Sequence, residues 1–289
     1  MTALITALSE ISDRYDAAFV DLWGCLHNGV RAHPEAVAAL QAFRSAGKRV
    51  VLLTNAPRPR ASVERQIAKM GVPEDAWDSI ATSGDSARAA MFRGAVGQKV
   101  WFIGEDHDQS FFDPLKVVSD PVEITRVPLE EAEGIVCCGP FDPHADPSVM
   151  RPEFLLAKQK GLKLLCANPD IVVDRGDSRE WCAGALARLY EEMGGETLYF
   201  GKPHPPIYDL ARRRLAEVGG GDGDAILAIG DGPHTDIDGA MGEDIDSLFV
   251  TGGLAAEETK TSHQPDEDLL RAYIEKEKIA PTFSIGHLR

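Results

Sequence analysis

Residues suited to phosphoryl chemistry follow four short apolar segments of this 289-residue chain. They are Asp21, the pair Thr54-Asn55, Lys202 and Asp231, with Asp236 five residues after the last. A carboxylate can attack phosphorus and form an aspartyl-phosphate, which divides one difficult displacement into two easier ones. Paired carboxylates suit Mg²⁺, a lysine neutralises the transferring group, and a threonine hydroxyl holds its oxygens. These residue types together predict metal-assisted phosphoryl transfer.

The segments that carry these residues alternate with helical patterns, which is typical of βαβ units and a mostly parallel sheet. Strands are predicted at Ala17–Val20, Arg49–Leu53, Thr197–Phe200 and Ala225–Ile229, and helices at Pro34–Ala46 and Ile207–Val218. Right-handed crossovers place the carboxyl ends of parallel strands on one edge, where ligands bind. We therefore expect all four strand ends, including the one before Lys202, to meet in one crevice.

A second set of strands and helices interrupts this alternation in the middle of the chain. Strands are predicted at Lys99–Ile103, Gly134–Cys138 and Leu162–Cys166, with a helix around Glu153–Lys160. This set is sufficient for a small α/β unit of its own. We predict a core made of residues 1–82 and 178–289, with residues 83–177 inserted as a cap that closes over the edge carrying Asp21.

The motifs, taken in order, resemble those of a known superfamily. They are Asp21-Leu22-Trp23-Gly24-Cys25-Leu26, Leu53-Thr54-Asn55, Gly201-Lys202-Pro203 and Gly230-Asp231-Gly232-Pro233-His234-Thr235-Asp236-Ile237. This order resembles the haloacid dehalogenase (HAD) superfamily, and the insertion with Asn168-Pro169-Asp170 resembles its class IIA, NagD-like branch. The resemblance covers about residues 15–255. It implies an α/β fold with a Rossmann-like parallel-sheet core and an inserted α/β cap of the C2 type.

The resemblance also implies roles for the residues that match the motifs. Asp21 matches the nucleophile and a Mg²⁺ ligand, Thr54 the phosphate-binding residue, and Lys202 the lysine that contacts nucleophile and substrate. Asp231 matches a metal ligand. Asp236 matches a second acidic position that binds the metal directly or through water, with a helix-start residue as the alternative.

Substrate contacts are predicted for three further positions. Asn55 stands beside the phosphate-binding threonine. Asn168 and Asp170, near the return from the insertion, either line the substrate side of the cap or form a turn around the proline between them. Arg58, after the second motif, is expected to face solvent, with contact to substrate as the alternative.

One position departs from the family pattern. Family phosphatases carry a second aspartate two residues after the nucleophile, which protonates the leaving group and then activates water. Trp23 stands there, and an indole cannot transfer this proton, although the Trp23 backbone carbonyl can still bind Mg²⁺. General acid–base catalysis contributes about 10²–10⁴-fold in rate. The alternatives are a slow phosphatase, an enzyme for good leaving groups, a substitute acid such as His27 or His204, or a phosphate-binding protein with little turnover.

Another chemistry known in this superfamily is the hydrolysis of carbon–halogen bonds. Asp231 argues against it here, because the dehalogenase branch works without Mg²⁺ and so has no need of this metal ligand. We therefore expect a Mg²⁺-dependent hydrolase acting on a small phosphorylated metabolite.

Composition and charge exclude other classes of partner. The chain has 30 Lys and Arg against 46 Asp and Glu, a formal net charge of −16, and 7% aromatic residues. Nucleic acid and anionic membrane need a basic surface, so neither is an expected partner. No apolar run approaches the roughly 18–20 residues of a membrane span, and Met1–Arg14 lacks the basic start of a signal peptide. Five cysteines without a C-x-x-C pair are read as reduced thiols of a cytoplasmic protein. A homodimer is compatible with these features.

Overall fold

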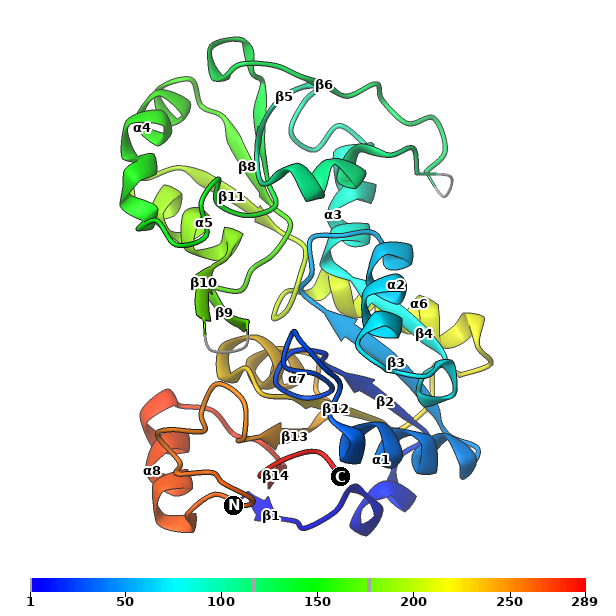
Figure 1. Cartoon of the computed structure of the whole chain (residues 1–289). Helices are drawn as coiled ribbons and strands as arrows, with labels where there is room; N and C mark the ends of the chain where they lie inside the picture. Colours follow the sequence, from blue (N-terminus) through cyan, green and yellow to red (C-terminus); the bar gives the residue numbers. More distant parts are fainter. Residues whose placement is uncertain (1, 116–117, 176–177) are drawn as a thin grey trace.

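Two parallel sheets organise the chain, and in Figure 1 the smaller lies above the larger. The computed structural model describes residues 2–115, 118–175 and 178–289. The larger sheet has the strand order β1-β14-β13-β12-β2-β3-β4, and all its neighbouring strands are parallel. Its strands are β1 (Ala3–Leu4), β2 (Ala17–Val20), β3 (Arg49–Thr54), β4 (Ser79–Thr82), β12 (Ile226–Gly230), β13 (Asp246–Val250) and β14 (Phe283–Ile285).

Helices cover both faces of the larger sheet. Successive residues of a strand point to opposite faces, and the apolar residues on each face pack against a separate layer of helices. One face carries α1 (Pro34–Ser45) and α2 (Arg60–Lys69), and the other carries α6 (Pro205–Glu217) and α8 (Glu267–Glu277), with α7 (Asp238–Gly242) following β12. Ala18 and Val20 of β2 belong to the core beneath α1 and α2, whereas Ala17 and Phe19 pack with α6. All four β2 residues are buried, which is why this strand reads as a continuous apolar run.

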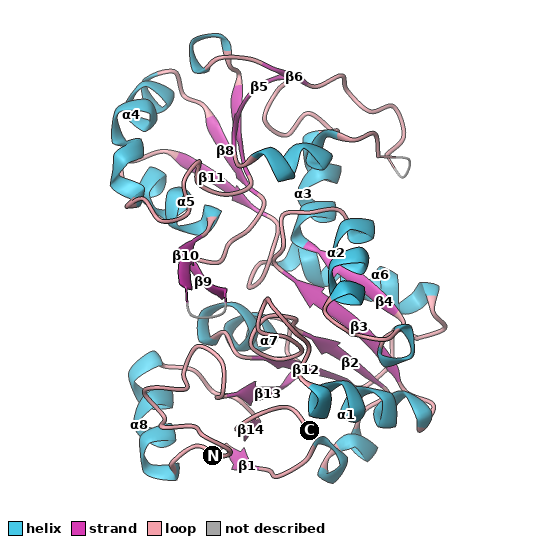
Figure 2. Cartoon of the chain, in the orientation of Figure 1, coloured by secondary structure: helices cyan, strands magenta, loops and turns pink. Residues whose placement is uncertain are grey.

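The smaller sheet has the order β11-β8-β7-β5-β6, again with parallel neighbours. Its strands are β5 (Lys99–Ile103), β6 (Thr125–Arg126), β7 (Gly134–Cys137), β8 (Lys163–Cys166) and β11 (Glu196–Tyr199). Helices α4 (Arg151–Gln159) and α5 (Ala183–Glu192) cover one face, and α3 (Ser83–Met91) covers the other with a 3₁₀ segment, Asp106–Phe112. An antiparallel hairpin, β9 (Val172–Arg175) and β10 (Ser178–Trp181), lies between the two sheets (Figure 2).

The inserted unit extends further along the chain than the sequence indicates. The predicted boundary at Asp177 lies outside the described residues, but β11, which was assigned to the core, pairs with β8 from Glu196↔Lys163 to Tyr199↔Cys166. Helix α5 packs on the same sheet. The alternation of an apolar strand and an amphipathic helix fits either sheet equally well, so only the long-range pairing of β11 decides its place. We call the unit from α3 to β11 the cap, and the rest the core.

Two further expectations can be compared with the structure. All five cysteines are buried free thiols, which agrees with their interpretation as reduced thiols. None of the helices in the described ranges has both the length and the apolar character needed to cross a membrane.

Candidate active site

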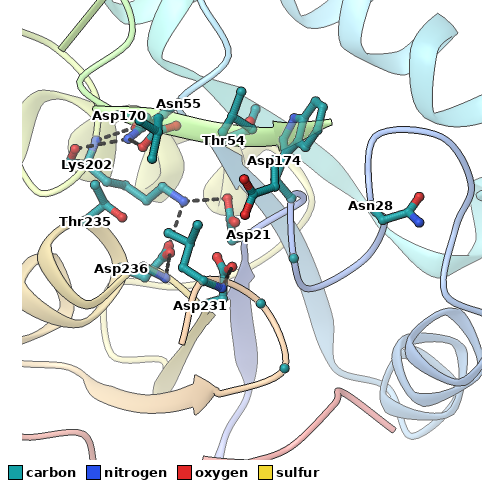
Figure 3. A pocket seen from close by; sticks show the side chains of 18 of the residues that line it. Asp21, Asn28, Thr54, Asn55, Asp170, Asp174, Lys202, Asp231, Thr235 and Asp236 are labelled. Carbon is teal, nitrogen blue, oxygen red and sulfur yellow. Dashed lines mark hydrogen bonds and ion pairs between the residues drawn. The ribbon is translucent and has the colours of Figure 1, made fainter. Parts of the chain in front are cut away.

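The carboxyl ends of β2, β3 and β12 meet at the switch point of the larger sheet. The chain moves from β2 through β3 to β4 on one side, and from β12 through β13 to β14 on the other. Ligands of open parallel sheets bind outside such a point. Asp21 follows β2, Asp231 follows β12 and Thr54 ends β3. The core sheet therefore brings these three predicted site residues together (Figure 3).

Lys202 also lies at this site, but the strand before it is not the one expected. It follows β11 of the cap sheet and lies just before α6, where the chain returns to the core. Its Nζ donates to Asp21 Oδ1 and to Asp236 Oδ1, both at 2.6 Å. The expectation that four strands of one sheet end at the site is therefore wrong for the strand before Lys202, which belongs to the cap.

Burial and charge act against each other in this cluster. Lys202 is only 2% exposed; burial opposes its charge, but Asp21, Asp236 and Asp170 outweigh burial and raise its pKa well above the ordinary value. Burial likewise raises the pKa of Asp21, and Lys202 opposes the rise. For Asp236, burial raises the pKa to about 6 in spite of Lys202. The lysine is thus held charged by the carboxylates, as a group that stabilises a phosphoryl transition state must be.

Asn55 of the core binds both the segment that returns from the cap to the core and a loop of the cap itself. Its Oδ1 accepts from Lys202 N at 2.7 Å, and its Nδ2 donates to Lys202 O at 3.2 Å and to Asp170 Oδ1 at 2.8 Å. A Cβ at Gly201 would lie less than 3.0 Å from Asn55 Oδ1, so this approach requires glycine. Asn55 was predicted to bind substrate; it lines the site cavity, but its amide hydrogen bonds hold Lys202 and Asp170 in place.

Asp231 is enclosed by backbone. Its Oδ2 accepts from Leu254 N at 2.9 Å, and it is 6% exposed. Gly24, which has φ +73°, and Gly253 both lie so close that a Cβ on either would stand less than 3.0 Å from Asp231 Oδ2. Gly24, in the first motif, must therefore be glycine for two reasons. Its backbone is in the left-handed region, and the Asp231 carboxylate occupies the space that a Cβ would need.

Asp236 belongs to the π-helical turn Pro233–Ile237 that follows β12. Its Oδ2 accepts from Gly232 N at 3.0 Å, while Oδ1 faces Lys202. Its position at the start of a helical segment agrees with the helix-start interpretation, whereas the predicted contact with a metal stays a prediction.

The acidic residues fit a divalent cation. Asp21, Asp231 and Asp236 are all buried, and Lys202 forms ion pairs with Asp21 and Asp236. When all three carboxylates are ionised, their three negative charges stand against the one positive charge of this lysine. Buried negative charges need a positive charge nearby, and carboxylate oxygens are the ligands that Mg²⁺ prefers. A divalent cation would therefore balance the excess negative charge. Cys25, which the sequence analysis gave no role, offers its Sγ within 4.8 Å of ligand atoms of Asp21 and Asp231. In the sequence, only its position four residues after Asp21 indicates that Cys25 could lie near the metal site.

The cap closes the site from above. A cavity of about 240 Å³ contains the core residues Asp21, Thr54, Lys202, Asp231 and Asp236 together with Asp170, Val172, Val173 and Asp174 of the cap. In Figure 3, Asp174 points into this space from β9. Sequence reasoning missed four polar residues of this cavity, Asp174 together with Asn28, His33 and Thr235. A phosphate ester placed on Asp21 would thus have its leaving group among cap residues.

Trp23 forms part of the cavity wall, and neither histidine proposed as its substitute reaches the cavity. His27 is 1% exposed, its Nδ1 accepts from Gly29 N at 3.1 Å, and its ring lies 5.2 Å from that of Trp23. Burial lowers the pKa of His27 to about 4, so it is neutral at pH 7. His204 stacks on Tyr199 at 4.5 Å. Neither is among the described residues that line the cavity, which removes both as substitutes in this arrangement.

Asn168 forms the turn that was one of its two interpretations from the sequence, and it is not among the described residues that line the active-site cavity. Its Oδ1 accepts from Asp170 N at 3.0 Å, which closes a turn around Pro169, and its side chain lies at a second cavity next to the site. Thr54 is buried, and its Oγ1 accepts from Ala56 N at 3.2 Å. The same hydroxyl retains its proton for donation to a phosphoryl oxygen.

Comparison with known proteins agrees with this geometry. Residues 18–117 match the family model described as haloacid dehalogenase-like hydrolase, and residues 199–273 match a second HAD-hydrolase-like model. A solved hydrolase of the haloacid dehalogenase-like family from Brucella suis 1330 is 38% identical, covers 99% of this chain and 100% of its own, and superposes with a TM-score of 0.85. The chain belongs to the haloacid dehalogenase-like hydrolase family.

HAD-family relatives of this chain include proteins named for an activity. Human glycerol-3-phosphate phosphatase is 25% identical over 295 residues, which cover 94% of this chain and 88% of the relative. A solved glycerol phosphate phosphatase from Mycobacterium tuberculosis, in complex with calcium, is 23% identical and has a TM-score of 0.65 over 96% of this chain and 74% of its own. Family membership and the predicted α/β fold are thus confirmed, and the chain is a hydrolase of the HAD type.

Proposed function

We propose that this protein is a Mg²⁺-dependent phosphatase that hydrolyses small phosphate monoesters through an aspartyl-phosphate on Asp21. The observation that carries the proposal is the buried cluster in which Lys202 bridges Asp21 and Asp236 beside Asp231. HAD-family relatives that are phosphatases support the same reaction. Because residues of both core and cap line a cavity of about 240 Å³, we expect small esters to fit better than polymers.

The residues divide the work as follows. An Asp21 carboxylate oxygen forms a bond to phosphorus while the bond from phosphorus to the ester oxygen breaks. Lys202 Nζ and the Thr54 hydroxyl hold the negative oxygens of the transferring group. Water then attacks the phosphorus of the aspartyl-phosphate, which releases inorganic phosphate and restores Asp21. Mg²⁺, held by Asp21 and Asp231 with the Trp23 carbonyl and with Asp236 directly or through water, would neutralise charge on the phosphoryl oxygens.

Trp23 determines how well this reaction proceeds. No carboxylate stands two residues after Asp21 to protonate the departing oxygen or to activate the water. We therefore infer slow turnover of alkyl esters and faster turnover of aryl or acyl phosphates, whose leaving groups need no proton. Asp170 and Asp174 are the cap carboxylates that line the cavity, and their position supports them, rather than the histidines, as candidates for residual proton transfer.

A phosphatase screen tests the proposal. Phosphate release from p-nitrophenyl phosphate and a panel of small metabolite phosphates is measured with Mg²⁺ and with a chelator. We expect Mg²⁺-dependent release that Asp21→Asn abolishes while the variant stays folded by circular dichroism. Release that persists in Asp21→Asn would refute the assignment of the nucleophile.

The rival function, phosphate binding with little turnover, gives a different result in the same assays. It predicts no release by the wild-type protein from any ester, together with tight binding of the same esters measured by calorimetry. Release from p-nitrophenyl phosphate that depends on both Mg²⁺ and Asp21 would exclude it.

A further inference from the structure

A cysteine thiol lies among the carboxylates of the active site. The Sγ atom of Cys25 and one carboxylate oxygen each of Asp21 and Asp231 all lie within 4.8 Å of one another, and the three residues are buried. Within the described part of the chain, this is the one group of three such side chains close enough together to share a metal ion. The proposed function uses the two carboxylates and leaves the thiol without a role.

The turn after β2 holds this thiol in place. Leu26 N and His27 N both donate to Leu22 O, at 2.8 and 3.0 Å, and Gly24 N donates to His27 O at 3.0 Å. These hydrogen bonds close a tight turn around Cys25, whose side chain packs at the end of the core beneath α1 and α2. The Cys25 thiol therefore keeps its position beside the two carboxylates without the help of a ligand.

This thiol also lacks a hydrogen-bond partner. Cys25 is 2% exposed, and its Sγ takes part in no hydrogen bond among the described residues. In contrast, the Sγ atoms of Cys137 and Cys166 lie 4.0 and 3.3 Å from the carbonyl oxygens of Gly139 and Asn168. A buried cysteine usually behaves as a small hydrophobic residue, but carboxylates are not apolar neighbours. A buried, unpaired thiol beside two buried carboxylates is the donor set of a cation that binds both sulfur and oxygen.

The chemistry of this donor set distinguishes Mg²⁺ from other divalent cations. Mg²⁺ takes oxygen ligands, so the Cys25 thiol adds nothing to its binding. Zn²⁺ binds thiolate sulfur at about 2.3 Å and carboxylate oxygen at about 2.0–2.2 Å, and tetrahedral geometry then places the ligand atoms about 3.4–3.6 Å apart. Small side-chain rotations bring atoms that lie within 4.8 Å of one another to this separation. When the metal binds, the thiol releases its proton to solvent and its sulfur coordinates the ion.

A cavity lined by core residues reaches the same thiol. This core-side cavity has a volume of about 300 Å³ and contains Cys25, His33, Glu35 and His287, and His33 also lines the active-site cavity. His287 Nε2 lies 3.1 Å from Ser262 O. Because a carbonyl only accepts, Nε2 carries the proton and Nδ1 keeps its lone pair. Imidazole and carboxylate are ligands that Zn²⁺ accepts, so a cation that enters by this cavity meets suitable groups before it reaches Cys25.

We propose that Cys25, Asp21 and Asp231 form a site for a thiophilic divalent cation of the Zn²⁺ class, which displaces Mg²⁺ from the two carboxylates. Binding of this cation does not require the proposed function, but its effect on activity rests on it. A four-coordinate ion with three protein ligands has one position left, whereas six-coordinate Mg²⁺ has several for phosphoryl oxygens and water. In a Mg²⁺-dependent phosphatase, Zn²⁺ at this site is therefore an inhibitor.

Metal titrations of the wild-type protein and two variants test the site. Cd²⁺ is the spectroscopic probe, because a Cd²⁺–thiolate bond gives a charge-transfer absorption in the ultraviolet, and Kd values for Zn²⁺ and Mg²⁺ are measured by calorimetry. The wild-type protein should show the absorption with one equivalent of Cd²⁺, and added Mg²⁺ should weaken the apparent affinity for Zn²⁺.

The variants locate the sulfur ligand. Loss of a residue that only orients a metal ligand costs about 10–100-fold in affinity, so loss of the ligand itself should cost at least about 100-fold. Cys25→Ser, which keeps the size of the side chain, should lose the Cd²⁺ absorption and bind Zn²⁺ at least about 100-fold more weakly, with the Kd for Mg²⁺ within about threefold. Cys138→Ser is the matched control, because Cys138 is also 2% exposed and follows β7 in the cap. It should behave as the wild-type protein does.

The results separate this site from the proposed function. Absence of the Cd²⁺–thiolate absorption in the wild-type protein overturns the site whether or not a variant folds, and equal Zn²⁺ affinities of wild type and Cys25→Ser overturn it as well. A Zn²⁺ affinity that does not respond to Mg²⁺ overturns the shared carboxylates. Zn²⁺ should inhibit the Mg²⁺-dependent hydrolysis of p-nitrophenyl phosphate at a concentration about 100-fold lower in wild type than in Cys25→Ser. A Cd²⁺–thiolate absorption without turnover of any ester refutes the phosphatase and supports the site, and turnover without the absorption does the reverse.

Discussion

Restoring a carboxylate at position 23 should accelerate the hydrolysis of alkyl phosphates. In Trp23→Asp, the new side chain would stand at the wall of the active-site cavity, near Asp21 and Asp231. Neighbouring carboxylates raise the pKa of an aspartate, which would help it to hold the proton that the leaving oxygen needs. General acid–base catalysis contributes about 10²–10⁴-fold, which corresponds to about 3–5 kcal/mol of activation free energy.

Loss of the indole acts in the opposite direction. Trp23 is only partly buried, but its ring packs against His27 at 5.2 Å, lies 5.6 Å from the Arg175 guanidinium, and fills the space beside Gly29. Removing a fully buried tryptophan costs about 3–5 kcal/mol of stability, and a partly exposed one costs less. Trp23→Asn removes nearly the same volume without the acidic group, so it is the reference for the loss of packing.

The assay is single-turnover and steady-state hydrolysis of an alkyl and an aryl phosphate with saturating Mg²⁺. We expect Trp23→Asp to exceed Trp23→Asn by at least about 100-fold on the alkyl ester and by much less on the aryl ester. The wild-type protein should release a burst of p-nitrophenol, because its second step also lacks a base. Equal alkyl rates for the two variants, both folded and metal-bound, would refute the reasoning and direct attention to Asp170 and Asp174.

Three other changes test the remaining parts of the site. Gly24→Ala should lower Mg²⁺ affinity at least about tenfold by displacing Asp231, whereas Gly47→Ala, with a similar φ of +83° and open space around it, should change stability but not affinity; equal affinities by calorimetry would contradict this. Lys202→Met should lower the metal-free unfolding free energy by about 3–5 kcal/mol, because it leaves buried carboxylates unpaired, and a loss below about 1 kcal/mol in urea titrations would argue against the cluster. His27 has a pKa of about 4, below its ordinary 6.5, so its contribution to stability is present above pH 6.5 and is lost as pH falls towards 4. The wild type should therefore lose about 3 kcal/mol more than His27→Gln over this range, and parallel pH–stability curves would disprove it.

Sequence patterns sufficed for the parts of the site that depend on local structure. Asp21, Thr54 and Asp231 could be placed because each ends or follows a buried parallel strand, and such strands end on one edge. Their strands are apolar on both faces, so their type was readable without the fold. These polar residues could therefore be assigned to one crevice.

The remaining parts depend on contacts between distant segments. The apolar pattern of β11 fits a strand of the core sheet and a strand of the cap sheet equally well. The strand that precedes Lys202 was therefore assigned to the wrong sheet. Arg58, expected to face solvent, is instead half-buried and lines the same second cavity as Asn168. Its burial depends on the cap that lies against it, and an arginine after a motif carries no local sign of that cap. The place of Asp174 depends on the β9–β10 hairpin, whose mixed polar and apolar residues resemble a loop. In each case tertiary contact, not propensity, decides.

The geometry also explains why the cap and the chemistry cannot be separated in this chain. The segment that returns from the cap to the core carries Lys202, and the cap loop between β8 and β9 carries Asp170. Both are held by the single amide of Asn55, which itself follows β3 of the core. The position of the cap is therefore tied to the position of the Lys202 ammonium, since both depend on the same three hydrogen bonds. The contact between cap and core in this arrangement thus also fixes the place of the Lys202 ammonium beside Asp21.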